Sequence, residues 1–156
     1  MAIVNVEHIN PFLMASANIL KEMCFVDPKM GKPYIKDPVF MDKTMVILIG
    51  FTGAMKGQVM ISLEHDIACD IASKMIMTPI NELDEFARSA ISELGNMIMG
   101  NTATIFSTKG IDIDITPPTV GCGTMSFTNS FAKNICVPLV YEGHKKIEIN
   151  IAIKGD

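Results

Sequence analysis

The chain has 156 residues, of which 49% are hydrophobic, and this size and composition fit one domain with a substantial buried core. Its formal net charge of −4 argues against a nucleic-acid-binding protein, because phosphate contacts need clustered Lys and Arg. No apolar run is long enough to span a bilayer and no secretory leader opens the chain, so we expect a cytoplasmic protein that does not bind a membrane.

The first third of the chain predicts a helix followed by an extended segment. Asn10 is a candidate helix cap and Pro11 suits the first helical position, after which apolar residues recur at helical spacing. The helix should end at Asp27-Pro28, because proline disfavours helical geometry in the residue before it. Residues 34–41 form a candidate strand, and Pro38 would place it at the edge of a sheet.

The middle of the chain predicts a β-hairpin and two helices. Residues 44–51 and 58–63 are rich in β-forming side chains and are separated by a loop that contains two glycines. Residues 64–77 return to helical spacing. Asn81 is a candidate cap for the next helix, which we expect to run from residue 81 to about residue 106 and to be the longest in the chain.

The last third predicts β-structure. Residues 111–116 alternate, residues 119–127 are interrupted by glycines, and residues 133–141 and 145–154 flank a hairpin loop. Alternate positions of the last segment are isoleucines, which predicts an antiparallel sheet with one covered face. The order of elements predicts an α+β fold in which three helices pack on this sheet, with residues 1–156 forming one domain.

One sector of the predicted long helix is polar. A helix turns by about 100° per residue, so Ser89, Glu93, Asn96 and Gly100 fall within about 60° of one another. Glu93 and Asn96 project side by side at i, i+3, while Ser89 and Gly100 leave room for another surface. Spacing alone also fits an ordinary solvated surface.

The adjacent sector of the same helix is apolar, and we expect it to face the core. It comprises Leu83, Phe86, Ala87, Ala90, Ile91, Leu94, Met97, Ile98 and Ile105.

A second Glu-x-x-Asn pair occurs at Glu7 and Asn10. Because Pro11 disfavours helix at Asn10 and Glu7 precedes the expected cap, we expect this copy to lack helical presentation.

The sequence gives little support to a metal or redox site. The four cysteines form no CxxC pair and have no histidine at zinc-ligand spacing, so we expect buried, reduced thiols. His8, His65 and His144 lie on separate predicted elements and form no recognisable triad. Asp112 and Asp114 alternate with Ile113 and are expected to decorate a strand rather than to bind a cation.

The pattern Ser89-x-x-x-Glu93-x-x-Asn96, followed some twenty residues later by Pro117-Pro118, resembles the signature of the CheC/CheX phosphatase family. The opening Ile9-Asn10-Pro11-Phe12 and the order of elements resemble the same family over essentially the whole chain. CheC-type relatives often carry two motif helices, and the expectation of one here favours the CheX type.

The resemblance implies a hydrolase that removes phosphate from the aspartate of a CheY-like response regulator in chemotaxis signalling. Asn96 would orient the attacking water and Glu93 would pair with a regulator lysine, while Ser89 and Gly100 would contact the partner. A neutral amide suits the task, because a carboxylate would repel the phosphoryl oxygens. The chain would need no cofactor of its own, with Mg²⁺ on the regulator, and would form a homodimer through sheet edges.

Two other function classes stay open at this point. The fold also serves assembly in related flagellar-switch components, so the chain could be a non-catalytic module that binds a response regulator or a flagellar switch. A small-molecule or metal enzyme would need a pocket with convergent groups, and the sequence predicts none.

Overall fold

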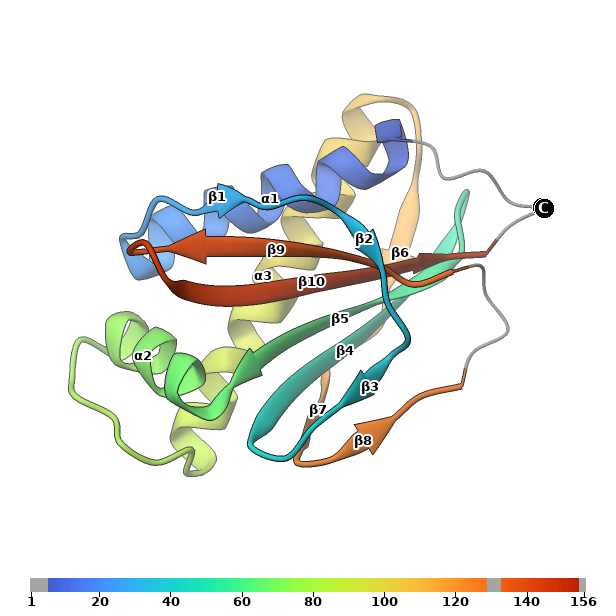
Figure 1. The fold of residues 1–156 in the computed structure, drawn as a ribbon. Coiled ribbons are helices and arrows are strands. Elements are labelled where there is room, and N and C mark those ends of the chain that lie inside the picture. The colour runs from blue at the N-terminus through green and yellow to red at the C-terminus, as the bar shows by residue number, and fades with distance from the viewer. Residues whose placement is uncertain (1–5, 129–132, 155–156) are drawn as a thin grey trace.

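A computed structural model describes residues 6–128 and 133–154, and these residues form a mixed fold in which helices cover one face of a sheet (Figure 1). The helices are α1 (Val6–Cys24), α2 (His65–Ile76) and α3 (Glu85–Thr108). The strands are β1 (Lys29–Met30), β2 (Tyr34–Ile35), β3 (Val39–Phe40), β4 (Thr44–Gly53), β5 (Gly57–Glu64), β6 (Ile113–Ile115), β7 (Thr119–Cys122), β8 (Met125–Ser126), β9 (Ile135–Tyr141) and β10 (Lys145–Ile153). The predicted α+β class is confirmed.

The main sheet has eight strands in the order β1-β9-β10-β5-β4-β6, with β2 also on β9 and β7 also on β4. Its pairs are antiparallel, as the alternating isoleucines predict. Strands β3 and β8 form a separate two-stranded sheet. Figure 1 shows α1 and α3 crossing behind the main sheet, with α2 at the end where β5 finishes.

The main core lies between the sheet and the helices. Ile147, Ile149 and Ile151 are buried on the face of β10 that belongs to this core. Phe12 of α1 joins the layers, with ring centroids 5.5 Å from Phe51 of β4 and 5.4 Å from Phe106 of α3. Aromatic contacts of this kind add to the free energy of area burial and hold α1 and α3 against the same strand.

The opposite face of the sheet is only partly solvated. A smaller cluster built on Phe40, Val46 and Met60 covers part of it. Asn150 of β10 is fully buried, accepts a hydrogen bond from Asn134 Nδ2 at 3.1 Å and donates to the Met60 carbonyl at 3.0 Å. The expectation of one covered face is therefore incomplete, because segments distant in the sequence also cover part of the second face of the sheet.

The start of α1 differs from the prediction. Asn10 is not the cap, since α1 already includes Val6 and carries Pro11 within it. Ile9, Pro11 and Phe12 are all buried, and their packing outweighs the local preference of proline for a helix start. The helix ends at Cys24, before the predicted Asp27-Pro28, and Phe25 follows with φ of 58°.

The boundaries of α3 also need correction, although it is the longest helix of the described chain. Asp84, not Asn81, is the N-cap, and its carboxylate accepts a hydrogen bond from the Ala87 amide at 2.8 Å. The helix continues to Thr108, and Gly110 with φ of 78° closes the turn beyond it. The candidate strand over residues 34–41 is two short strands, β2 and β3.

Across the described residues, we find no helix that combines the length and hydropathy needed to cross a bilayer.

Candidate functional site

Helix α3 lies unusually close to the sheet at its centre. A Cβ built on Gly95 would lie only 2.8 Å from Ile47 Cγ2 of β4. Glycine at this position lets the helix backbone approach the strand without displacing Ile47. Gly95 lies about 160° from Glu93 around the helix axis, so this contact fixes the inner side of the helix whose outer side carries Glu93.

The outer face of α3 presents the predicted polar pair. Leu94, Gly95 and Ile98 are buried toward the sheet and α1, whereas Glu93 is exposed and Asn96 is half-buried. Residues at i, i+3 on a helix have Cβ atoms about 5–6 Å apart, so the carboxylate and the amide can act on one bound partner. The structure thus brings Glu93 and Asn96 together as the sequence predicts.

Small residues flank the pair on both sides. Ser89 is exposed one turn before Glu93, and Gly100 is half-buried one turn after Asn96. A Cβ built on Gly100 would have no heavy atom within 4 Å, so this glycine borders open space rather than a packed neighbour. Another protein can therefore approach the α3 backbone closely beside Asn96.

The second Glu-x-x-Asn pair is helical, contrary to the prediction. Glu7 and Asn10 both lie in α1 and both are exposed. Met14 lies one turn after Asn10 and is 53% exposed. The equivalent position in α3, one turn after Asn96, is Gly100. The two pairs share their spacing but differ in the bulk beside the amide.

The prediction that Phe86 faces the core is wrong. Its side chain is 66% exposed, although Ala87 and Ile91 on the same helix are buried. Phe86 lies in the first turn of α3 and at the margin of the apolar sector, and the helix wheel cannot tell whether a neighbour covers that margin. It extends the outward face that carries Glu93.

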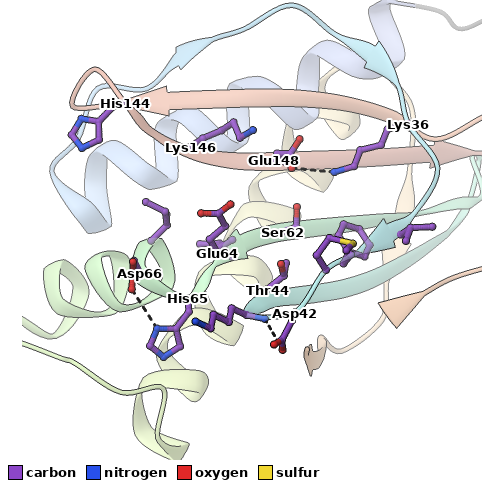
Figure 2. A pocket seen from close by; sticks show the side chains of 16 residues that line it. Lys36, Asp42, Thr44, Ser62, Glu64, His65, Asp66, His144, Lys146 and Glu148 are labelled. Carbon is purple, nitrogen blue, oxygen red and sulfur yellow. Dashed lines mark hydrogen bonds and ion pairs between the residues drawn. The ribbon is translucent and has the colours of Figure 1, made fainter. Parts of the chain in front are cut away.

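A large hollow lies elsewhere, on the sheet face opposite α3 (Figure 2). It has a volume of about 890 Å³ and is open to solvent. Lys146 and Glu148 of β10 point into it, while Ile147 between them belongs to the main core. The hollow therefore shares no residue with the outer face of α3.

One carboxylate in the hollow, Glu148, is paired with a lysine. Glu148 accepts hydrogen bonds from Tyr34 Oη at 2.6 Å and from Lys36 Nζ at 3.1 Å. Burial alone would raise the pKa of Glu148, but the donors Tyr34, Cys136 and Lys36 outweigh it and hold the pKa below its usual value. This carboxylate belongs to a structural ion pair.

The histidines and cysteines do not assemble a metal centre in the described residues. His65 and His144 both line the hollow, while His8 lies on α1. No group of three or more His, Cys, Asp or Glu among residues 6–128 and 133–154 could hold a metal ion. Cys24, Cys69 and Cys136 are buried as expected, but Cys122 is exposed.

Comparisons with known proteins agree on one family. Residues 45–139 match the family model described as "Chemotaxis phosphatase CheX", a range that includes Ser89 to Gly100 and Pro117-Pro118. The chain is 30% identical over 148 residues to a CheY-P phosphatase CheX from Thermotoga maritima, covering 94% of this chain and 96% of that protein.

Solved structures are similar over nearly the whole chain. A CheC-like superfamily protein from a Shewanella species has a TM-score of 0.85 and 30% identity, with 97% of this chain and 100% of that chain covered. The CheX chain in a CheX–CheY–BeF₃–Mg²⁺ complex from Borrelia burgdorferi has a TM-score of 0.82 and 31% identity, with coverages of 96% and 99%.

Proposed function

The chain belongs to the CheX family of chemotaxis phosphatases, and from this membership we propose that it hydrolyses the aspartyl phosphate of a CheY-like response regulator on the outer face of α3. The observation that carries the proposal is the outward pair of Glu93 and Asn96, flanked by Ser89 and Gly100. The cytoplasmic location and the single domain over residues 1–156 expected from the sequence are parts of this proposal.

Asn96 positions the nucleophile. Its side-chain carbonyl accepts a hydrogen bond from a water that lies in line with the phosphorus atom. The water oxygen forms the new bond to phosphorus, the bond from phosphorus to the aspartate oxygen breaks, and inorganic phosphate and a free carboxylate leave. An acyl phosphate is already reactive, so placement of the water without added negative charge is the main requirement.

Glu93 fixes the partner rather than removing a proton. Its exposed carboxylate, one turn from Asn96, is suited to pair with a lysine beside the regulator's phosphoryl group. Ser89 and Gly100 contribute by leaving space for the regulator backbone. We assign the Mg²⁺ to the regulator, and the Borrelia burgdorferi complex, which holds CheY, BeF₃ and Mg²⁺ together, supports this assignment.

The direct test is the lifetime of the aspartyl phosphate on a purified CheY-like regulator, with and without this protein. We expect the protein to shorten that lifetime catalytically. The chain offers a matched control: Glu93→Ala with Asn96→Ala should abolish the effect, while Glu7→Ala with Asn10→Ala should retain it. Binding without any change in lifetime would instead favour a non-catalytic regulator-binding module.

A further inference from the structure

We propose that Phe86 is the apolar anchor by which the phosphorylated response regulator docks on α3. This inference rests on the proposed function and names a binding residue for the same partner. Phe86 is 66% exposed, in the first turn of a helix whose inward residues are buried. No neighbouring side chain of the described residues buries this large apolar ring, so it is available to a partner that binds the outer face of α3.

Phe86 lies on nearly the same side of α3 as Glu93. At about 100° per residue, Phe86 is about 20° from Glu93 around the helix axis, with Ala90 and Met97 at about 60° and 40°. These three residues form an apolar margin along one side of Glu93, and both Ala90 and Met97 are half-buried. Seven residues separate Phe86 from Glu93, which corresponds to about 10 Å along the helix.

A specific docking surface has to reach Phe86 if it is centred on the catalytic pair. A typical stable protein interface buries about 800 Å² on each partner, the area of a disc about 16 Å in radius. Phe86 lies about 10 Å from Glu93 along the helix, which is well within this radius. An exposed ion pair such as that of Glu93 contributes less affinity than a buried aromatic ring, because the ring supplies a large contact area.

The two ends of the outer face differ, and this difference orients the partner. Beyond Asn96, Gly100 borders open space and permits close approach of the regulator backbone. At the other end, Phe86 projects and needs an apolar recess on the regulator about 10 Å from the phosphorylated aspartate. Only one orientation of the regulator satisfies both ends, so Phe86 also contributes specificity.

The experiment compares Phe86→Ala with Phe25→Ala, since Phe25 has nearly the same exposure, 67%, but lies on the turn after α1. Calorimetry would measure Kd for the BeF₃-activated regulator, and phosphate release would give kcat and KM. Phe86→Ala should raise Kd and KM by about 10-fold or more, with kcat within about 2-fold of wild type. Phe25→Ala should leave Kd and KM unchanged, and Phe86→Leu should recover most of the affinity that Phe86→Ala loses.

The outcomes separate the anchor from the function. Unchanged Kd and KM in Phe86→Ala would overturn the anchor, and if Asn96→Ala still lost turnover the proposed function would stand. A fall in kcat at constant KM in Phe86→Ala would also overturn the anchor. Wild-type binding that depends on Phe86 but leaves the phosphate lifetime unchanged would support the anchor and refute the phosphatase. No regulator binding by the wild type would overturn both.

Discussion

At the residue scale, Asn96 is the side chain whose removal should affect turnover most. Asn96→Ala should lose about 2–4 kcal/mol of transition-state stabilisation, because the amide acts on a water that is held only in the catalytic geometry. Asn96→Asp should be little better, since it places an anion beside the phosphoryl group. Single-turnover phosphate release measures the loss, and calorimetry should show nearly unchanged regulator affinity. Full activity in Asn96→Ala would contradict the mechanism.

Glu93 should behave differently from Asn96. Glu93→Ala should weaken both regulator binding and turnover, because its proposed partner is a lysine on the regulator. The affinity of the wild type should also fall more steeply with ionic strength than that of Glu93→Ala, since salt screens an exposed ion pair. Calorimetric titrations at about 50 and 300 mM salt make the comparison, and equal salt dependence in the two proteins would argue against the pair.

At the scale of an element, the contact between Gly95 and Ile47 holds α3 at its distance from β4. Gly95→Ala would place a methyl group 2.8 Å from Ile47 Cγ2, so packing strain should exceed the gain in helix propensity. We expect the free energy of unfolding to fall by roughly 1–2 kcal/mol in urea titrations. The matched variant is Gly100→Ala, which should be neutral or slightly stabilising because its Cβ meets open space. A stabilised Gly95→Ala would show that α3 can move outward without cost.

A charge cluster connects α2 to the β9–β10 hairpin. Lys145 Nζ lies 3.3 Å from Asp70 and 2.8 Å from Glu142, and Lys74 Nζ bridges the same two carboxylates. Burial by itself would raise the pKa of Asp70, but hydrogen bonds from Tyr141 and Lys145 outweigh it and lower the pKa. Hydrogen bonds from Lys145 and Lys74 lower the pKa of Glu142.

The cluster should make stability depend on pH in the acid range. Carboxyl groups whose pKa is lower in the folded state stabilise the fold above their ordinary values of 3.8 and 4.5, and that contribution is lost as the pH falls through the folded-state values. Urea unfolding at pH 7, 4 and 3 should show the decline. Lys145→Met should reduce the decline, whereas an identical pH dependence in that variant would exclude the cluster as its cause.

At the scale of the whole molecule, we propose a homodimer through a sheet edge. Among the described residues, five of ten exposed large hydrophobic side chains lie between residues 30 and 41: Met30, Tyr34, Ile35, Val39 and Met41. Met30, Tyr34 and Ile35 lie on β1 and β2, at the β9 edge of the main sheet, whereas Val39 lies on β3 of the two-stranded sheet and Met41 follows it. Exposed apolar side chains along an edge strand favour association with a second chain.

Sedimentation equilibrium at tens of micromolar protein should therefore report a dimer. At this concentration an association free energy of about 7 kcal/mol is enough to keep most chains dimeric. Ile35→Lys, at a side chain that is 61% exposed, should shift the protein to monomer without loss of folding. Because this segment does not include α3, a monomeric variant should still bind the regulator. A wild-type monomer at this concentration would refute the proposal.

The sequence by itself determined the features that depend on local periodicity. Alternation predicted the antiparallel sheet, and helical spacing placed Glu93 and Asn96 on one face of the longest helix, as the structure confirms. The short signature around them resembles that of the CheC/CheX family, and the match of residues 45–139 to the CheX family model confirms this resemblance.

Only the tertiary structure decided which surfaces are covered. Phe86 belongs to the apolar sector of the wheel yet lies outside the core, and Asn150 lies on the polar side of its strand yet is fully buried. The local preference of proline would start a helix at Pro11, but in the structure Pro11 lies inside α1. The reason is that the residues around it are packed into the core. In each case segments distant in sequence set the burial, and their contact free energy outweighs preferences of about 1–3 kcal/mol that the local sequence can express.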